Sequence, residues 1–455
     1  MKISLNVRPA ILLTIFLCYN YFDTYKFMTV TFIGHGYVGL VTACVFADLG
    51  NKVWVVGRTP EKIEKLKAGD PLFYEPEIKE LLQKNIKEGR IFFTLDYKES
   101  VGESDAVFIA VGTPPQETGA ADLSTVFEVA EKIGQNLESG FTVVSCKSTV
   151  TIGTNKKIEE IINRVKPVGS EFAIASCPEF LSQGTAVQNT FKPDRVVIGS
   201  DSKKAIDVLT ELHRPIDAPN IITDLASAEL IKYTANAMLA TKISFANLIA
   251  QYSEKTGANV ESVLDAVGID KRIGRVFMNP GVGYGGSCFP KDVKALIQIG
   301  KSLGIDTALL DGVEKTNLNM RQNVIDKIVE NVPGKAIAIL GLSFKPNTDD
   351  IREAPSVYII KDLLEKGFKI NVYDPQAMKK IKGVFEDRIN FFENSYDAIK
   401  DTSALVVLTE WDEFKNLDLE KVKSLLKNSI IIDGRNIYDP EKVKALGFRY
   451  LGVGR

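Results

Sequence analysis

The sequence predicts an α/β protein with two Rossmann-like, doubly wound parallel-sheet domains, joined by a central helical domain with one long spine helix. Three observations predict this fold class. Short apolar runs alternate with helical patterns up to about residue 215, and the same alternation returns near residue 333. Between these two regions, residues 224–255 have a continuous helical pattern that contains no glycine or proline. Such alternation of strands and helices is typical of a parallel sheet with helices on both faces.

Length and composition fit this organisation and exclude several classes of protein. The chain has 455 residues, enough for two or three domains. Its net charge is −2, from 56 basic and 58 acidic residues, so no broad basic field indicates binding to nucleic acid or a membrane surface. The five cysteines are scattered without a Cys-x-x-Cys pair, and there are only two histidines. These residues predict no disulfide framework and no metal site, and they favour a reducing, cytoplasmic location.

Residues 1–27 are an uncertain N-terminal extension ahead of the first predicted strand. The apolar run at 9–19 follows Lys2 and Arg8, as in a weak signal peptide. It is too short to span a bilayer, however, and no small-residue cleavage site follows it. We therefore expect an extension outside the folded domains and no membrane association; a membrane anchor is the alternative.

The first α/β domain is predicted over residues 28–215. It opens with a strand at 29–33, a Gly-x-Gly-x-x-Gly turn, an apolar helix that ends before Gly50, and a second strand at 52–56. This order is the opening of a dinucleotide-binding unit. Further strands are predicted at 105–111, 141–145, 172–176 and 195–199.

The central helical domain is predicted over residues 216–330. Its helix at 224–255 is apolar almost all round, so we expect it to be buried on most sides, between domains or between subunits. A second α/β domain follows at 331–455. Its signals are a strand and turn at 334–344, a helix at 356–367, and strands at 368–375, 403–411 and 429–436.

The glycine turn, Gly34-x-Gly36-x-x-Gly39, predicts a binding site for the pyrophosphate of a dinucleotide at the following helix N-terminus. The second strand of such a unit usually ends in an acid that holds the ribose 2′-hydroxyl of NAD. Here Gly57 stands in that place, and Arg58 follows. An arginine suits a 2′-phosphate, which favours NADP; alternatively, Arg58 stacks on adenine and NAD binds.

Two polar residues share one face of the long helix. Lys232 and Asn236 are four residues apart, and on a helix this apolar they need partners. One interpretation is a positive charge and an amide donor aimed at an oxyanion. The other is a structural hydrogen-bonded pair with Glu229.

The stretch GYGGSCFPKD, residues 283–292, combines glycines with a thiol and two charged groups. The glycines let the backbone approach a ligand closely. Lys291 would favour the thiolate of Cys288, and Asp292 could serve as a base. From these residues alone, Cys288 is either a nucleophile or a buried structural thiol.

Together these stretches resemble the nucleotide-sugar 6-dehydrogenases of the UDP-glucose/GDP-mannose dehydrogenase family over nearly all of residues 28–455. The resemblance is carried by GHGYVGL, FIAVGTPP, KSTVTIGT, CPEFLSQGTA, AELIKYTANAMLATKISFAN, RIG, GYGGSCFPKD, GLSFKPNTDDIREAPS, VYDP and IIDGRNIYD, in this order. The wording of NAMLATKISFAN and GGSCFPKD is more similar to the UDP-glucose branch than to the N-acetylhexosamine branch. The resemblance assigns nucleotide-sugar binding to residues 331–455.

This resemblance implies oxidation of a nucleotide sugar by four electrons. The 6-hydroxymethyl group of UDP-glucose would become a carboxylate while two molecules of NAD, or of NADP, are reduced. Cys288 would form a thiohemiacetal with the aldehyde and then a thioester, which water hydrolyses. The alternatives are the same reaction on GDP-mannose or a UDP-N-acetylhexosamine, a two-electron hydroxyacid dehydrogenase, or a nucleotide-sugar-binding protein without catalysis.

The resemblance also implies roles for individual residues. Catalysis would involve Cys288, Lys232 and Asn236 as oxyanion stabilisers, Asp292 in proton transfer, and Glu179 with Thr149 at the hydrolytic water. Cofactor binding would involve Gly34, Gly36, Tyr37, Val38, Gly39, Arg58, Lys62, Thr113, Thr149, Lys291 and Arg352. Substrate binding would involve Glu179, Phe180, Leu181, Lys232, Asn236, Arg272, Phe277, Gly281, Tyr284, Gly285, Lys345 and Arg435. Arg272 would reach into the substrate site of the partner in a homodimer.

The chain departs from the family pattern at three places. Gly57 replaces the usual acid, which puts the choice between NAD and NADP in doubt. Ser182 and Gln183 stand where an arginine and a glutamate are usual, so local contacts to sugar or cofactor differ. Thr151 replaces a proline. None of these changes removes a catalytic group.

Overall fold

The computed structural model describes residues 26–455 of the chain. The apolar run at 9–19, for which we expected an extension, lies outside the described residues. None of the helices in residues 26–455 is long and apolar enough to cross a membrane.

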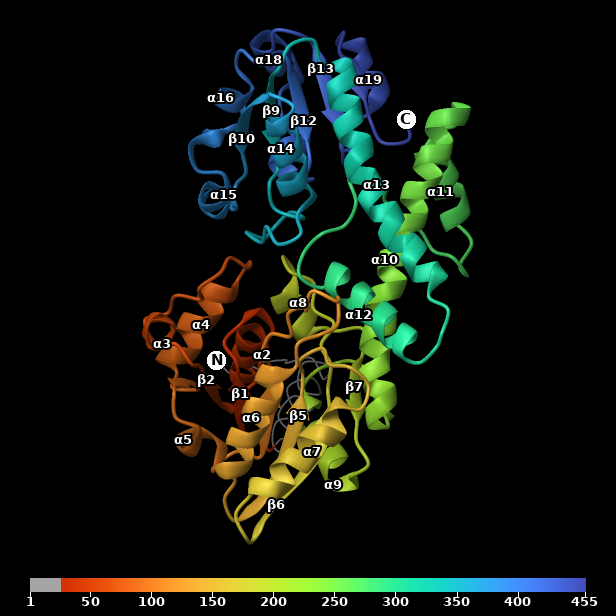
Figure 1. Ribbon diagram of the computed structural model, residues 1–455. Helices are drawn as coiled ribbons and strands as arrows, with labels where there is room; N and C mark the ends of the chain where they lie inside the picture. Colours follow the sequence, from red (N-terminus) through yellow and green to blue (C-terminus); the bar gives the residue numbers. More distant parts are fainter. Residues whose placement is uncertain (1–25) are drawn as a thin grey trace, which may run out of the picture.

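The first α/β domain contains an eight-stranded sheet in the order β3-β2-β1-β4-β5-β6-β7-β8 (Figure 1). Neighbouring strands are parallel, except that β6 and β7 meet in one antiparallel pair, Ser176 with Gly199. The reversal of strand order next to β1 is the doubly wound arrangement that creates a crevice at the carboxyl ends of the strands. The strands are β1 (Thr29–Ile33), β2 (Lys52–Val56), β3 (Ile91–Thr94), β4 (Ala106–Ile109), β5 (Gly140–Cys146), β6 (Ser170–Ser176), β7 (Val196–Gly199) and β8 (Asn220–Thr223).

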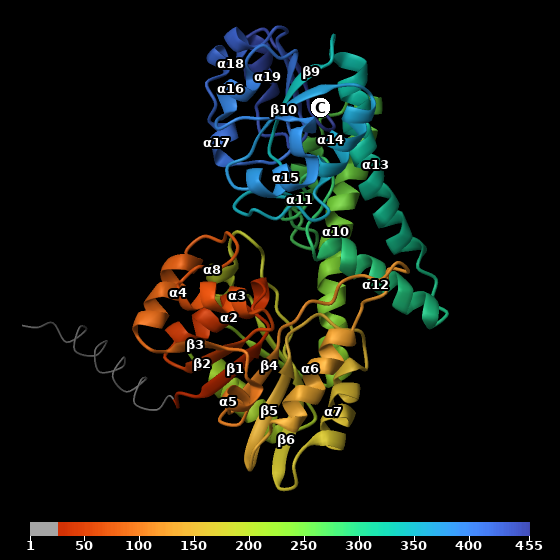
Figure 2. The same cartoon turned by 60° about the vertical axis from the view of Figure 1, so that its left-hand side comes forward.

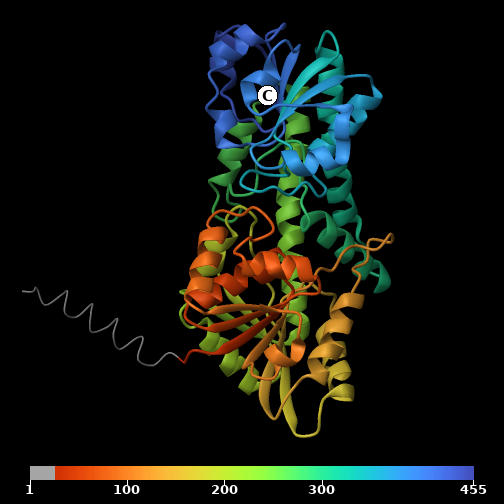
Figure 3. The same ribbon diagram turned by 90° about the vertical axis from the view of Figure 1, so that its left-hand side faces the viewer.

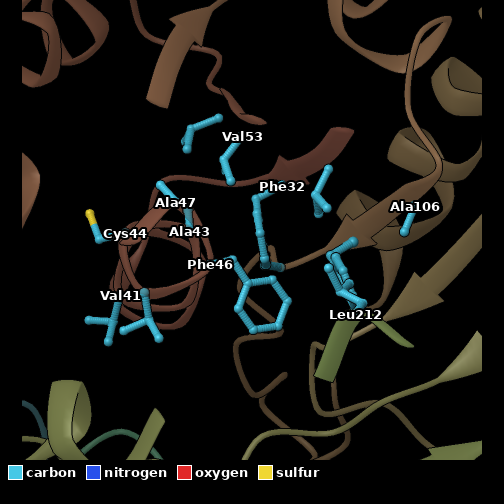
Figure 4. Packing of buried hydrophobic residues seen from close by; sticks show 14 of the residues in the cluster. Phe32, Val41, Ala43, Cys44, Phe46, Ala47, Val53, Ala106 and Leu212 are labelled. Carbon is cyan, nitrogen blue, oxygen red and sulfur yellow. The ribbon is translucent and has the colours of Figure 1, made fainter. Parts of the chain in front are cut away.

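Helices cover both faces of this sheet, and each face has its own apolar core. On one face, the ring of Phe32 stacks on Phe108 with centroids 5.0 Å apart, and Phe46 makes a T-shaped pair with each of these rings. Figure 4 shows Phe32 and Phe46 in this core. This packing fixes the strand that precedes the glycine turn against the helix that follows it. The helices are α2 (Tyr37–Asp48), α3 (Pro60–Lys67), α4 (Ile78–Lys87), α5 (Tyr97–Val101), α6 (Ser124–Gln135), α7 (Thr154–Val165), α8 (Ala186–Phe191) and α9 (Lys203–His213).

The long helix α10 (Leu225–Thr256) passes from the first domain to the other end of the molecule (Figures 2 and 3). The Asp224 carboxylate caps its start by accepting from the Ser227 backbone N–H, and Gly257 ends it in the left-handed conformation at φ 77°. Many of its residues are buried, from Leu225 to Ser253, but within residues 26–455 no other element covers one side of the helix. The exposed apolar residues there are Leu230, Met238, Phe245, Leu248 and Tyr252.

The rest of the central region consists of α11 (Val260–Gly268), α12 (Phe289–Ser302) and α13 (Ala308–Asn331). The second α/β domain has a six-stranded, fully parallel sheet in the order β11-β10-β9-β12-β13-β14. Its strands are β9 (Ala336–Leu340), β10 (Lys369–Tyr373), β11 (Asn390–Phe391), β12 (Ala404–Val407), β13 (Ile430–Asp433) and β14 (Arg449–Leu451). Its helices are α14 (Pro355–Glu365), α15 (Met378–Phe385), the short 3₁₀ helix Glu386–Arg388, α16 (Ser395–Ile399), α17 (Asp412–Lys415), α18 (Leu419–Leu425) and α19 (Pro440–Ala445).

The predicted fold class is confirmed, with two differences of detail. The sheet of the first domain includes β8, which lies beyond the expected boundary at residue 215. Four strands, β3, β8, β11 and β14, were not anticipated as strands from the sequence. The two α/β domains lie at opposite ends, and α10 and α13 run between them (Figure 1).

Candidate active site

The three glycines of the turn, Gly34, Gly36 and Gly39, have different physical roles. A Cβ atom on Gly34, which has φ +118°, would stand 2.4 Å from the Ala110 carbonyl oxygen, and one on Gly39 would stand 2.1 Å from the Gly34 carbonyl oxygen. Both positions therefore need glycine for packing of β1 against β4 and α2. Gly36 has nothing within 4 Å of where its Cβ would stand. This open backbone at the start of α2 fits the pyrophosphate of a dinucleotide.

At the end of β2, where an acid usually holds the ribose, Gly57 leaves room for the side chains of Ile63 and His35. A Cβ on Gly57 would stand 2.9 Å from Nδ1 of His35, and this nitrogen is buried without a hydrogen-bond partner. Burial lowers the pKa of His35, and the positive charges of Lys62 and Arg58 lower it further. In the described part of the chain, neither Arg58 nor Lys62 forms an ion pair. Sequence reasoning missed His35, although a histidine between the first two glycines of the turn was a signal.

The other expected cofactor residues lie on three elements around this turn. The Tyr37 hydroxyl donates to the Glu75 carboxylate, and Val38 follows it in the first turn of α2. The Thr113 hydroxyl donates to the Thr149 carbonyl oxygen at 2.9 Å. The Lys291 ammonium lies 3.5 Å from the Thr113 hydroxyl and 2.5 Å from Asp292. Lys291 lies in the first turn of α12 and thus links this helix to Thr113, one of the expected cofactor residues.

Lys232 and Asn236 meet different carboxylates. The Lys232 ammonium pairs with Glu179 at 3.0 Å, and the Asn236 amide donates to Asp292 at 2.6 Å. The alternative pairing with Glu229 is not what the structure contains. Glu229 instead accepts from the backbone N–H groups of Gly153 and Asn155, at 2.6 and 2.8 Å, at the start of α7.

The Lys232–Glu179 pair is buried, since their side chains are only 5% and 8% exposed. Burial alone would lower the pKa of Lys232, but the acidic groups around it, first Glu179 and then Cys288 and Asp292, outweigh burial and raise it. Lys232 is therefore a fixed positive charge at neutral pH. The second carboxylate oxygen of Glu179 accepts from the Leu181 N–H at 2.5 Å, which fixes its orientation.

Cys288 is the N-cap residue of α12 and the one exposed thiol among the four cysteines of residues 26–455. A helix N-terminus favours a thiolate, but the walls of the site remove much of the surrounding water. This desolvation raises the pKa of Cys288, and the charge of Glu179 raises it further, while Lys232 opposes both. The site thus holds a protonated thiol near two buried carboxylates, Glu179 and Asp292, which are paired with the ammonium groups of Lys232 and Lys291 respectively.

Some of the expected substrate residues line a neighbouring cavity, and Lys345 and Arg435 lie in the second α/β domain. The cavity has a volume of about 620 Å³, and its walls include Glu179, Phe180, Leu181, Lys232, Asn236 and Phe277. The Phe180 ring lies under the Arg195 guanidinium, 3.7 Å from ring centroid to Cζ. Arg435 pairs with Glu410 at 3.2 Å and donates to the Leu408 carbonyl oxygen.

Gly281, Gly285 and Gly286 are closely packed against other parts of the chain and do not border open space. A Cβ on Gly285 would stand 2.3 Å from the Glu353 carbonyl oxygen, and one on Gly286 would stand 2.8 Å from the Phe344 ring. A Cβ on Gly281 would stand 3.0 Å from the Gly434 carbonyl oxygen. Tyr284 is buried, and its hydroxyl lies 3.4 Å from Glu314. The loop is therefore pressed against the second α/β domain.

Two expected arginines lie in different surroundings: the Arg352 carbonyl oxygen accepts from the Gly286 backbone N–H at 2.9 Å, close in sequence to Cys288, whereas Arg272 is on the surface. Arg352 pairs with Asp350 at 2.6 Å in the second α/β domain. Arg272 is 89% exposed and pairs with its neighbour Asp270 at 2.6 Å. Within the described chain, this ion pair is the only one that Arg272 makes.

Comparison with known proteins places this geometry in a family. The NAD binding domain of the UDP-glucose/GDP-mannose dehydrogenase family matches residues 28–217, its central domain matches 226–319, and its UDP binding domain matches 338–440. UDP-glucose 6-dehydrogenase TuaD of Bacillus subtilis is 45% identical over 426 residues, which cover 93% of this chain and 92% of that protein. The chain belongs to the UDP-glucose/GDP-mannose dehydrogenase family. The family suggested by the sequence motifs is thereby confirmed, and the chain is an oxidoreductase with a NAD binding domain.

Other members of the family agree over the same length. The UDP-glucose 6-dehydrogenase of Pseudomonas aeruginosa is 40% identical over 443 residues, 94% of this chain and 98% of that protein. The solved UDP-glucose dehydrogenase of Pyrobaculum islandicum superposes with a TM-score of 0.88 at 36% identity, covering 95% of this chain and 98% of that one. The UDP-D-ManNAc dehydrogenase of Pyrococcus horikoshii superposes with a TM-score of 0.81 at 26% identity, covering 94% and 99%.

Proposed function

We propose that this chain is a UDP-glucose 6-dehydrogenase, which oxidises the 6-hydroxymethyl group of UDP-glucose to a carboxylate and reduces two dinucleotides. The observation that carries the proposal is the exposed Cys288 thiol at the start of α12, whose pKa is influenced by the charges of Lys232, Glu179 and Asp292. A two-electron dehydrogenase has no need of a nucleophilic thiol in such a place. The named activity of the B. subtilis and P. aeruginosa relatives supports the choice of substrate.

A dinucleotide held at the turn of Gly34, Gly36 and Gly39 would supply the hydride acceptor for each of the two oxidation steps. In the first, a carboxylate of the cluster takes the proton of the 6-hydroxyl group, and the Lys232 ammonium stabilises the developing oxyanion. The sulfur of Cys288 then adds to the aldehyde carbon, and its proton passes to the carbonyl oxygen, which gives a thiohemiacetal. Oxidation of this adduct leaves a thioester on Cys288.

Hydrolysis of the thioester restores the thiol. We propose that Glu179, with Thr149, positions and deprotonates the attacking water, and that Lys232 and Asn236 stabilise the tetrahedral oxyanion. The carbon–sulfur bond breaks, the carboxylate leaves with the nucleotide, and Cys288 regains a proton. The ion pair of Lys232 with Glu179 supports this division of roles, because it holds the stabilising charge and the base side by side.

The decisive experiment counts reduced cofactor per UDP-glucose consumed. We expect two for the native chain. One reduced cofactor per sugar, with free aldehyde released, would overturn the thioester mechanism; turnover of GDP-mannose without turnover of UDP-glucose would overturn the substrate. The variant Cys288→Ser should still bind UDP-glucose and lose the complete reaction, and an unchanged rate would make Cys288 structural.

We propose that the cofactor site accepts NADP as well as NAD. His35 occupies the space of the missing acidic side chain, and Arg58 and Lys62 add positive charge without a paired carboxylate in the described residues. A 2′-phosphate would gain charge-assisted hydrogen bonds there. Adenosine 2′,5′-bisphosphate should bind about tenfold tighter than 5′-AMP, and Arg58→Ala should remove this preference while Lys65→Ala on α3 keeps it. Equal binding of the two probes would contradict the proposal.

We also propose that the chain works as a homodimer in the cytoplasm. The exposed residues Leu230, Met238, Phe245, Leu248 and Tyr252 fall on one stripe of α10, and such a contiguous apolar face indicates a partner. The free thiols of the described cysteines are compatible with a reducing compartment. Sedimentation should give a dimer for the native chain and a monomer for Met238→Glu with Phe245→Glu. In the dimer, Arg272→Ala should raise the KM for the sugar.

A further inference from the structure

The two α/β domains are hydrogen-bonded to each other through one dipeptide. In residues 26–455, we find three hydrogen bonds that join the first domain to the second, and all three involve Ser182 or Gln183. The Lys345 ammonium donates to the Ser182 hydroxyl at 2.7 Å. The Gln183 amide donates to Asp350 at 3.1 Å and accepts from the Thr348 hydroxyl at 3.3 Å.

The next residue brings the two backbones into contact. Gly184 has φ +86°, and a Cβ there would stand 3.0 Å from both the Cβ and the carbonyl oxygen of Asn347. Any other residue would be strained and would push the two loops apart. The segment 182–184 is therefore shaped to receive the loop 345–350 of the second α/β domain.

On the other side, this segment is anchored beside the glycine turn of the cofactor site. The buried Glu75 carboxylate accepts from the backbone N–H groups of Gly184 and Ala186, both at 2.6 Å. The same carboxylate accepts from the hydroxyl of Tyr37, which lies inside the Gly-x-Gly-x-x-Gly motif. A polar chain thus runs from the glycine turn through Glu75 to the dipeptide.

The dipeptide contacts two groups of the expected ligand site. Lys345 has no carboxylate within ion-pair distance in the described chain, and the Ser182 hydroxyl is its one side-chain hydrogen bond. Gln183 acts on Arg352 indirectly, because both side chains bind the Asp350 carboxylate. Ser182 and Gln183 are therefore suited to hold Lys345 directly and Arg352 through Asp350.

We propose that Ser182 and Gln183 are positioning residues that hold the second α/β domain against the cofactor domain, and so place Lys345 at the nucleotide sugar and Arg352 at the cofactor. The identity of these ligands rests on the proposed function, but the docking of the domains does not. The segment joins the two halves of the site that both oxidation steps must use.

Hydrogen exchange in the ligand-free protein tests the docking. The readout is the segment 343–352, which lies in the other domain from the mutated residues. The double variant Ser182→Ala, Gln183→Ala should exchange there about tenfold faster than the native chain, because the loop loses its three cross-domain bonds. Ser182→Thr keeps the hydroxyl and should exchange like the native chain.

The chain offers a matched control on the same element. The Gln188 amide on α8 donates to Glu77 at 2.8 Å, entirely within the first domain. Gln188→Ala should leave exchange in 343–352 unchanged. Unchanged exchange in the double variant, or equal acceleration in Gln188→Ala, would overturn the proposal.

Steady-state kinetics separates positioning from direct contact with a ligand. The double variant should raise the KM for UDP-glucose about tenfold and change kcat by less than about threefold, since the reacting groups stay in place. A raised KM without faster exchange would overturn the proposal, because Ser182 and Gln183 would then touch the ligand themselves. If UDP-glucose is not a substrate, the proposed function fails while the exchange experiment still decides the docking.

Discussion

The raised pKa of Cys288 has a direct chemical consequence. Desolvation and the charge of Glu179 both favour the neutral thiol, and Lys232 only partly opposes them. An ordinary cysteine is about 3% thiolate at pH 7, and each unit of raised pKa removes a further factor of about ten. Because the thiolate is the species that reacts, iodoacetamide should alkylate Cys288 more slowly than a free thiol at pH 7. The rate should then climb about tenfold per pH unit from pH 7 to 9, without a plateau.

Removing the charged neighbours of Cys288 one at a time should change its alkylation rate in opposite directions. Glu179→Gln removes a charge that disfavours the thiolate, so alkylation at pH 7 should become faster. Lys232→Met removes the charge that favours it, so alkylation should become slower. Mass spectrometry of separate peptides distinguishes Cys288 from Cys18, which lies outside the described residues, and from the buried Cys44, Cys146 and Cys177. Alkylation faster than in the unfolded chain at pH 7, or a plateau below pH 8, would refute the reasoning.

Three further predictions concern other parts of the molecule. Gly39→Ala should lower both thermal stability and cofactor affinity, because its Cβ would stand 2.1 Å from a backbone oxygen, whereas Gly36→Ala should lower only cofactor affinity, measured by titration. Glu229→Gln should cost about 2–4 kcal/mol in the free energy of unfolding, because its carboxylate accepts N–H groups at the start of α7; the exposed Glu160→Gln is the control, and equal stabilities would contradict the assignment. Asn236→Asp should lower kcat by about a hundredfold at pH 8, because it places a second carboxylate against Asp292. The rate should partly recover at pH 6, where the two carboxyl groups share a proton. A rate that does not depend on pH would argue against the contact between residues 236 and 292.

The interior of both sheets was predictable from the sequence, and the edges were not. β1 and β2 have the bounds that their apolar runs predicted, because central parallel strands are buried on both faces. The four strands that were not predicted, β3, β8, β11 and β14, are the four edge strands of the two sheets. Each has only two to four residues, and β8 is largely exposed. A run this short does not identify a strand, and this holds even for the apolar and mostly buried β3.

The sequence indicated that Lys232 and Asn236 share a face of α10, and it did not indicate which carboxylates they contact. Helical spacing placed Lys232 and Asn236 on one face of α10, but it also placed Glu229 near them. Which carboxylate meets which donor depends on what packs against each turn: α7 receives Glu229, and α12 brings Asp292 to Asn236. The stripe of exposed apolar residues on α10 was equally unpredictable, because a sequence pattern does not indicate which side of an apolar helix the rest of the chain leaves exposed.

The departures from the family pattern have a common physical character. Gly57 leaves room for the ring of His35, Ser182 supplies an acceptor to Lys345, and Gln183 supplies a donor to Asp350. Each of these three residues contacts a neighbour that lies elsewhere in the sequence. None of the three is among the groups that shift the pKa of Cys288. They therefore alter contacts of the glycine turn and between the domains, and leave the surroundings of the Cys288 thiol unchanged.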